Sequence, residues 1–209
     1  MDKTSERPNG STGPSAASVE HLSQHQLRRL SEAFELWHRR ASSSYIRRVR
    51  GRYWLSYLFL RFTGARIGEV LRLNDLADID FDRNEVRILR SEYRNLRNVL
   101  RTVPVPPLVT RQVLDYRDEF PGMRGRVFAL DQGNFRREFY RRAQEADLPR
   151  DLSHPHILRH TRAVEMLRAG VPLTTVQELM GHVLSGTTAL YLQRTEITVR
   201  KVLEDKGLL

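Results

Sequence analysis

A stretch with strand character lies between two helical regions of this chain. Between residues 78 and 105, short apolar runs flank a turn at Asp82-Arg83-Asn84 and end on prolines, as in a small antiparallel sheet. Before it, apolar residues recur at helical spacing from Leu22 onward, and residues 45–62 carry so much apolar bulk that they must be core. After Pro107 the pattern is helical again, with breaks at prolines and glycines. We therefore predict a mainly α domain with one small antiparallel β-sheet, in the α+β class.

The first residues differ in composition from the rest. Residues 1–18 are rich in Ser, Pro, Gly and Thr and have almost no large apolar side chain, so burial cannot offset their ordering entropy. We expect them to form a disordered tail. Residues 19–195 are long enough for one well-cored domain, and residues 196–209 form a short amphipathic tail segment.

The charge balance indicates the kind of partner. Lys and Arg number 35 against 25 Asp and Glu, which gives a net charge of +10 and favours a polyanion such as nucleic acid. The alternative is a solvated surface in an arginine-rich proteome. The only lysines are Lys3, Lys201 and Lys206, so nearly every cationic side chain is an arginine. Its planar guanidinium group suits bidentate contacts with phosphate.

Two absences limit the location and the cofactors. The chain has no cysteine, which excludes disulfides and thiolate metal sites and fits a reducing compartment. No apolar run approaches the roughly 20 residues of a membrane span, and the N-terminus has no apolar signal core. We expect a cytoplasmic protein without a metal or other cofactor and without a membrane partner.

The first motif of chemical interest runs from Thr63 to Glu69. Arg66 follows a predicted helix break at Gly64, where a side chain can point from a helix start into a cleft. Glu69 lies three residues on, on the same helical face, and could orient a nearby basic side chain. The ordinary alternative is a surface arginine and an exposed glutamate.

A second motif begins at Ser153, which with Pro155 indicates a helix start. His156 and Arg159 are three residues apart and share one face of that helix, so both can meet one phosphate. We place His160 on a different azimuth, as a structural histidine satisfied in the core. A structural role for the whole His-x-x-Arg pattern is the alternative.

The last motifs are Gly181-His182 and, nine positions after His182, Tyr191, with Thr187-Thr188 between them. Each motif alone is weak. In this order and spacing, over roughly residues 45–195, they resemble the active site of the tyrosine recombinases, also called the phage integrase family. The resemblance implies that residues 19–195 are a catalytic domain of that fold.

The resemblance assigns a role to each motif. Tyr191 would be the nucleophile that forms a 3′-phosphotyrosyl link, while His182 would donate a hydrogen bond to the phosphate. Arg66 and Arg159 suit the clamp on the non-bridging oxygens, because charge builds up there in the transition state and an arginine stays charged. His156 completes the set, and Glu69 supports it.

The sequence departs from the family pattern in the turn between the second and third strands. The family has a lysine there, which acts as the general acid for the 5′-hydroxyl, whereas residues 89–98 contain none. Arginine is a poor proton donor at neutral pH because its pKa is above about 12. We predict instead that Arg90, Arg94 and Arg97 bind the DNA backbone from this hairpin.

A second departure concerns the regions outside the motifs. Family members usually carry a helical core-binding domain ahead of the catalytic one, whereas only a helix at about 21–40 and a tail precede the match here. We expect a catalytic domain that stands alone, with an accessory DNA-binding protein as a candidate partner. The resemblance implies a homotetramer on double-stranded DNA, in which residues 196–209 dock on a neighbouring protomer; the alternative is a tail folded onto its own domain.

Two functions remain open. The first is a site-specific recombinase or integrase that cleaves and rejoins DNA through Tyr191, and the presence of all five active-site residues favours it. The second is a DNA-binding transcriptional regulator that reuses the fold without strand exchange, which the absent lysine and clamp domain favour. An RNA-binding or structural basic helical protein would explain none of the ordered motifs. A phosphotyrosyl adduct separates the first function from the second.

Overall fold

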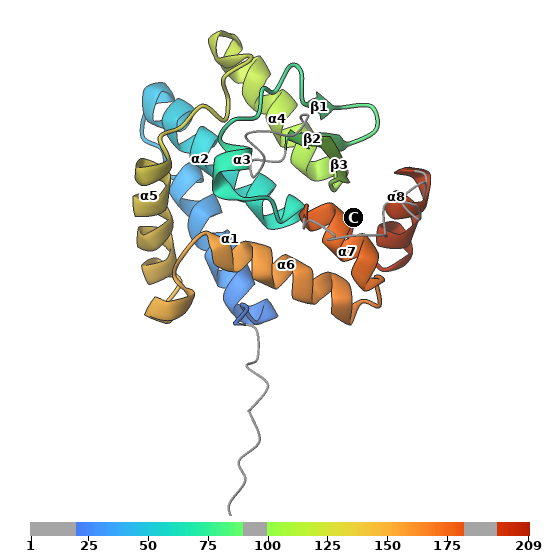
Figure 1. Cartoon of the computed structure of the whole chain (residues 1–209). Coiled ribbons are helices and arrows are strands. Elements are labelled where there is room, and N and C mark those ends of the chain that lie inside the picture. The colour runs from blue at the N-terminus through green and yellow to red at the C-terminus, as the bar shows by residue number, and fades with distance from the viewer. Residues whose placement is uncertain (1–19, 90–99, 182–195) are drawn as a thin grey trace, which may run out of the picture.

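The described part of the chain is mainly helical, as predicted. The computed structural model describes residues 20–89, 100–181 and 196–209, and Figure 1 shows their arrangement. The helices are α1 (Gln24–Arg39), α2 (Ser44–Thr63), α3 (Ile67–Val70), α4 (Pro107–Glu119), α5 (Gln132–Glu145), α6 (His156–Arg168), α7 (Leu173–Met180) and α8 (Glu196–Asp205), with short 3-10 helices η1 (Pro121–Met123) and η2 (Arg150–Leu152). The strands are β1 (Ile79–Asp80), β2 (Glu85–Leu89) and β3 (Leu100–Pro104).

Helix α2 is the central element of the core. Its residues from Trp54 to Leu60 are all buried, which agrees with the apolar bulk of this segment. It packs against α1, α4 and α6. Because these helices surround α2, it has no polar face in this stretch. Its two ends determine where the chain enters and leaves the core.

Helix α1 packs its apolar face against α2 and α5. Ser23 caps its N-terminus by accepting a hydrogen bond from the backbone N–H of Gln26. The Phe34 ring stacks on Tyr57 of α2 with 4.3 Å between the ring centroids. Leu27, Leu30 and Phe34 on this face are therefore core residues, whereas Trp37 is half-buried.

The three strands form one antiparallel sheet in the order β1-β2-β3. Val86 pairs with Val103, and Ile88 pairs with Arg101. All four lie on the buried face of the sheet, so Arg101 stands among apolar residues. In Figure 1 the sheet lies beside α7 and α8 through β3, with α1 and α6 at the other end of the molecule.

Helix α8 packs against β3 of its own chain. Leu203 is buried there, and Arg200 donates a hydrogen bond of 3.1 Å to the carbonyl of Asn84. Arg162 of α6 donates one of 3.1 Å to the carbonyl of Leu208. In this structure the tail segment thus folds onto its own domain. None of the helices among the described residues has the length and apolarity to cross a membrane.

Candidate functional site

The backbone between α2 and α3 turns sharply just before Arg66. Gly64 ends α2 in the left-handed region with φ at 63°, and its N–H donates to the carbonyl of Leu60. The Thr63 hydroxyl accepts the Ala65 N–H at 3.1 Å. A Cβ at position 64 would come within 2.9 Å of the Met180 sulfur, so the turn also allows α7 to approach α2. The helix break predicted at Gly64 is confirmed.

Arg66 and Glu69 form the start of α3. The Glu69 carboxylate accepts a hydrogen bond of 2.9 Å from the backbone N–H of Arg66, and its second oxygen lies 3.8 Å from Nη1 of the same arginine. The side chain of Glu69 has no exposed surface, whereas that of Arg66 is 29 % exposed. The alternative of an exposed glutamate is therefore wrong, and Arg66 retains access to solvent.

A third residue, Arg101, closes on Glu69 from the sheet. Its Nη2 lies 2.7 Å from Oε2 of Glu69 and its Nη1 lies 3.3 Å from Oε1, in the bidentate geometry that suits this pair. Burial by itself would raise the pKa of the Glu69 carboxyl, but Arg101 and then Arg66 outweigh it and hold that pKa below its usual value. Glu69 is ionised at neutral pH. We refer to Arg66, Glu69 and Arg101 as the Glu69 cluster.

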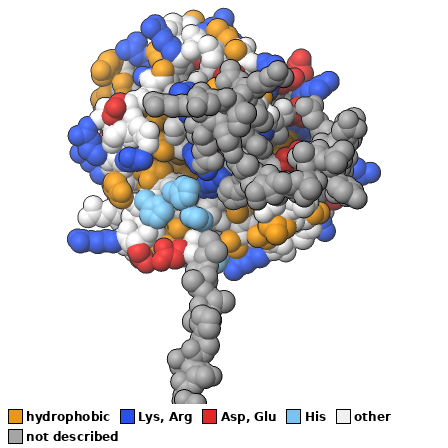
Figure 2. Space-filling model, viewed as in Figure 1, with side chains coloured by type: hydrophobic (Ala, Val, Ile, Leu, Met, Phe, Trp, Pro, Cys, Tyr) orange, Lys and Arg blue, Asp and Glu red, His pale blue; other side chains and the backbone are white. Residues whose placement is uncertain are grey.

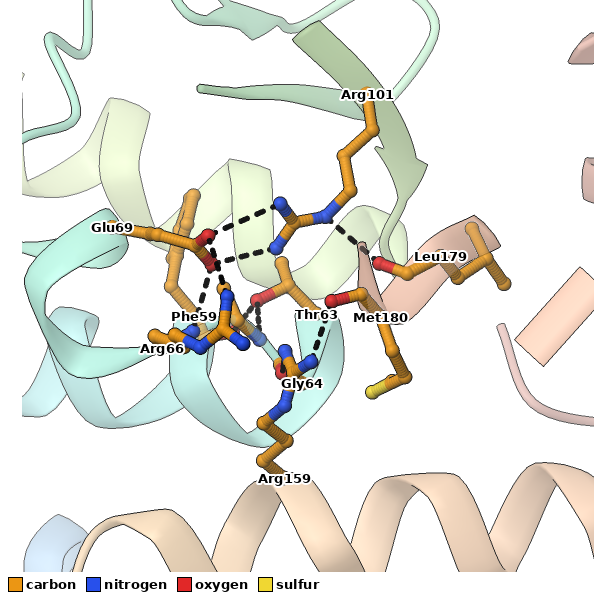
Figure 3. A network of polar contacts seen from close by, with 10 residues as sticks. Phe59, Thr63, Gly64, Arg66, Glu69, Arg101, Arg159, Leu179 and Met180 are labelled. Carbon is orange, nitrogen blue, oxygen red and sulfur yellow. Dashed lines mark hydrogen bonds and ion pairs between the residues drawn. The ribbon is translucent and has the colours of Figure 1, made fainter. Parts of the chain in front are cut away.

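Arg159 reaches the same region from α6. Its Nη1 donates to the carbonyl of Gly64 at 2.8 Å, and its Nη2 donates to the carbonyl of Met180 at 2.6 Å. The residue is 5 % exposed. Figure 3 shows Arg101 and Arg159 approaching the end of α7 from opposite sides. Carbonyls at a helix C-terminus lack helical partners and carry partial negative charge, so a guanidinium is favourable there.

His156 begins α6 and lies beside two other histidines. Its ring meets that of His160 edge to face, with 4.6 Å between centroids. Partial burial, together with the charges of His160, Arg159 and His154, lowers the pKa of His156 to about 4, so its ring is neutral at pH 7. The placement of His160 in the core is wrong: it is half-buried and lies one helical turn after His156, on the same side of α6.

Arg66 and His156 line one pocket of about 560 Å³, together with Ala65, Ile67, Gly68, Gln132, Arg136, Tyr140, His154 and Pro155. Among the residues from α5, Arg136 adds a cation and Tyr140 adds an exposed aromatic residue to its wall. Figure 2 shows a patch of histidine side chains on this face of the molecule. The pocket combines fixed positive charge with neutral imidazole, which suits a phosphate group.

The structure brings together four of the predicted residues: Arg66, Glu69, His156 and Arg159. Arg66 and His156 face the pocket, while Glu69 and Arg159 lie buried behind it. Predicted residues that lie outside the described part of the chain are His182, Tyr191, Arg90, Arg94 and Arg97. Within the described ranges, no three His, Asp or Glu side chains are grouped closely enough to hold a metal ion.

Arg101 is not among the residues predicted from the sequence. A usable signal was present, because Arg101 precedes Val103 and Val105 at the two-residue spacing of the inner face of a strand. A charge at such a position is tolerated only with a buried partner. The pattern therefore indicated a carboxylate buried beside Arg101, and Glu69 is that carboxylate.

Comparison with known proteins gives matches over most of the chain. A model of the phage integrase family matches residues 20–196. Tyrosine recombinase XerC of Corynebacterium glutamicum is 36 % identical over 153 residues, which cover 68 % of this chain and 46 % of the relative. XerC of Roseiflexus castenholzii is 34 % identical over 158 residues, with 69 % and 47 % covered. The chain thus spans about half the length of these curated relatives.

Solved structures share the fold. The crystal structure of XerA recombinase superimposes with a TM-score of 0.63 at 23 % identity, covering 94 % of this chain and 66 % of that one. The structure of XerH site-specific recombinase bound to its difH substrate gives 0.63 at 23 % identity, with 88 % and 53 % covered. The helical arrangement around a small sheet is therefore common to all three.

Proposed function

The chain belongs to the phage integrase family, and we propose that it is a site-specific DNA recombinase or integrase that works as a tyrosine-type strand transferase. The observation that carries the proposal is the pocket shared by Arg66 and His156, with Arg159, Glu69 and Arg101 fixed behind it. The substrate is double-stranded DNA.

The arrangement of charge fits a phosphodiester. The guanidinium groups of Arg66 and Arg101 pair with the single carboxylate of Glu69. That of Arg159 binds the carbonyls of Gly64 and Met180, so the region has an excess of positive charge. Fixed cations of this kind stabilise the extra negative charge of a five-coordinate phosphorus, and they need no reorganisation during the reaction. We assign Arg66 and Arg159 to the non-bridging oxygens, with His182 as a hydrogen-bond donor.

In the proposed reaction the Tyr191 hydroxyl attacks the phosphorus. The Tyr191 O–H bond breaks and its proton passes to His156, the tyrosyl O–P bond forms, and the bond from phosphorus to the 5′-oxygen breaks. That oxygen takes up a proton to become a 5′-hydroxyl. The 3′-phosphotyrosyl ester conserves the bond energy, so a 5′-hydroxyl from another strand can reverse the step without a cofactor.

His156 is suited to proton transfer in this reaction. Because its ring is neutral at pH 7, it can accept a proton from a hydroxyl. Its pKa in the DNA-free protein is low, but a phosphate anion beside the ring would raise that pKa toward the range in which imidazole is an effective base. Binding of DNA would therefore prepare His156 for the step that follows.

The leaving 5′-oxygen needs a proton from a group other than a hairpin lysine, since residues 89–98 contain none. A 5′-bridging phosphorothioate tests this point, because a thiolate leaves without protonation. If proton donation limits the reaction, this substrate should be cleaved faster than the normal phosphodiester. Equal rates would mean that the protein already supplies an efficient acid.

The wider assembly is also part of the proposal. Arg90, Arg94 and Arg97 bind the DNA backbone from the hairpin, strand exchange takes place in a homotetramer on DNA, and an accessory protein adds DNA contacts. The cytoplasm, where DNA is accessible, is the proposed location. The similarity to proteins named as recombinases favours strand exchange over the alternative of a transcriptional regulator.

The test is covalent trapping. Nicked suicide duplexes drawn from the DNA that flanks its gene are incubated with the protein, and an SDS-resistant adduct is sought. We expect an adduct that disappears in Tyr191→Phe. A clear footprint on the same DNA without an adduct would favour the regulator.

The matched control is Tyr140→Phe. Tyr140 is 49 % exposed and lines the pocket with Arg66 and His156, so it is the competing tyrosine among the described residues of that pocket. We expect Tyr140→Phe to form the adduct at close to the normal rate. Loss of the adduct in Tyr140→Phe with retention in Tyr191→Phe would assign the nucleophile to Tyr140 instead.

A further inference from the structure

Arg101 occupies a position where a strand normally places an apolar side chain. It lies on the inner face of the sheet, opposite Ile88 and two residues before Val103, and its side chain is only 4 % exposed. A guanidinium removed from water to this extent must have its donors satisfied. The identity of its partners therefore indicates what the buried charge is for.

The guanidinium of Arg101 holds two separate elements. Its Nη1 and Nη2 form the bidentate pair with Glu69 of α3, and its Nε donates a hydrogen bond of 2.9 Å to the carbonyl of Leu179 in α7. Figure 3 shows this side chain between the two elements. A single planar fork from β3 thus joins segments that are 32 and 78 residues away in sequence.

Glu69 transmits the position of Arg101 to Arg66. The oxygen Oε2 that lies 2.7 Å from Arg101 also accepts the backbone N–H of Arg66 at 2.9 Å. Since that N–H belongs to the N-cap residue of α3, the position of the carboxylate sets where the Arg66 side chain leaves the backbone. Arg101 itself does not line the pocket.

The end of α7 is held in the same way. Arg101 binds the carbonyl of Leu179, and Arg159 binds the carbonyl of Met180. Gly181 follows with φ at 71°, and a Cβ there would lie 2.8 Å from Nη1 of Arg101. The backbone that leads into residue 182 is therefore packed directly against the Arg101 guanidinium.

We infer that Arg101 is a positioning residue for strand cleavage, which sets Arg66 through Glu69 and sets the end of α7 through Leu179. The inference rests on the proposed function, because it concerns how that site is held together. A lysine would keep the charge but would lose the fork, whose separate nitrogens face the carboxylate and the carbonyl. Arg66 and Arg159, which come from distant parts of the chain, can thus meet one phosphate.

The main test compares Arg101→Gln with Arg61→Gln. Arg61 makes a bidentate pair with Glu165, with both distances 2.8 Å, away from the pocket residues. Adduct formation is timed at saturating nicked duplex, and the half-saturating duplex concentration is measured separately. We expect Arg101→Gln to slow cleavage about 100-fold with little change in half-saturation, and Arg61→Gln to cleave at nearly the normal rate. Equal rates in the two variants would overturn the inference.

Two further variants keep the test valid if Arg101→Gln is poorly folded. Arg101→Lys retains a cation beside Glu69 and should fold, with a cleavage rate between those of the parent and Arg101→Gln. In the Glu69→Gln background, adding Arg101→Gln should slow cleavage by a much smaller factor than Arg101→Gln does alone. The reason is that the effects of contacting residues that act together are not additive. Fully additive losses would contradict a role exerted through Glu69.

A substrate with a 5′-bridging phosphorothioate separates positioning from proton donation. Arg101→Gln should remain slow on this substrate relative to the parent protein, since a misplaced clamp affects any leaving group. Recovery to the parent rate would mean that Arg101 supports protonation of the leaving oxygen, and would overturn the positioning role.

Backbone hydrogen exchange provides a measurement that does not depend on activity. In Arg101→Gln we expect faster exchange in residues 64–70 and 178–181, and in Arg61→Gln we expect no change there. If the parent protein forms no adduct on any duplex, the proposed function fails, while this comparison still tests the role of Arg101. Unchanged exchange in both segments would overturn it.

Discussion

Among the described residues, two clusters of arginine surround a buried or half-buried glutamate, and they differ in the location of the backbone carbonyls that their other donors bind. In the Glu69 cluster the donors reach the carbonyl of Leu179 as well as the carboxylate. In the second cluster, which consists of Arg61, Arg162 and Glu165, Arg162 donates to the carbonyl of Leu208 near the C-terminus. We refer to it as the Glu165 cluster.

The difference shows how a common interaction becomes part of a site. Both clusters satisfy buried guanidinium groups by the same chemistry, and by ion-pair geometry alone the bidentate pair of Arg61 and Glu165 is the more symmetrical. What separates them is location. The Glu69 cluster binds backbone beside the pocket, whereas the Glu165 cluster joins α2 and α6 to the chain end.

The largest contrast is expected between two arginines of α6. Arg159→Gln removes the cation assigned to the phosphate and should slow adduct formation about 100- to 1,000-fold. Arg162→Gln breaks the Glu165 cluster and should lower thermal stability while leaving that rate nearly unchanged. Rates of adduct formation and melting temperatures of both variants check this. A comparable slowing in both would show that the two clusters do not differ in function.

The glutamates should differ next. Glu69→Gln leaves Arg101 buried without a carboxylate, and breaking a buried pair of this kind costs about 3–5 kcal/mol of unfolding free energy. We expect it also to slow adduct formation by up to about 100-fold. Glu165→Gln acts on a side chain that is 22 % exposed, so its cost should be smaller and its cleavage rate normal. Urea unfolding and adduct timing measure both quantities; the reverse ranking would break the comparison.

A smaller effect is expected at two glycines with similar backbone conformations. Gly181 and Gly170 have φ values of 71° and 81°, so alanine at either site should cost about 1–2 kcal/mol of unfolding free energy. At Gly181 the new Cβ also meets the Arg101 guanidinium, whereas at Gly170 the nearest atom is Lys206 Nζ at 3.5 Å. We therefore expect slower cleavage only in Gly181→Ala. If Gly170→Ala slows cleavage equally, backbone strain alone accounts for the loss.

The smallest effect concerns pH. The pKa of His156 is lowered to about 4, below about 6.5 in an unfolded chain, so the unfolded state binds more protons between these values and stability falls as the pH decreases from about 6.5 to about 4. His156→Gln should reduce this loss. Burial, followed by the charge of Arg61, lowers the pKa of Arg162 to about 10, so Arg162 should not contribute in that range. Melting temperatures at pH 7 and 4.5 test both statements.

The sequence predicted the architecture and part of the site. Helical spacing located α1 and α2, and Gly64 and the prolines marked the breaks, because these residues act locally on the backbone. The spacing of His156 and Arg159 and the helix-start signal at Ser153 and Pro155 placed both residues at the start of α6. Residue spacing predicts a contact correctly where that contact depends on one helix or one turn.

What the sequence reading missed depends on contacts between distant segments. Arg101 was not singled out, since its partners Glu69 and Leu179 lie in other elements. His160 was misplaced because residues four apart share one side of a helix, so its ring meets the ring of His156 at the edge of the pocket rather than the core. Helix spacing gives the direction of a side chain, but the packing of the whole chain decides whether it is covered.

The Glu69 cluster also bears on the order of folding. Its contacts join β3 to segments 32 and 78 residues away, whereas α1 and α2 can pair through a short connection. Contacts between distant segments carry a larger loop-closure entropy and form later on average. A chain that has assembled only α1 and α2 would be helical without an anion site. We therefore expect phosphate affinity to report the final steps of folding, after helical signals have reached their native values.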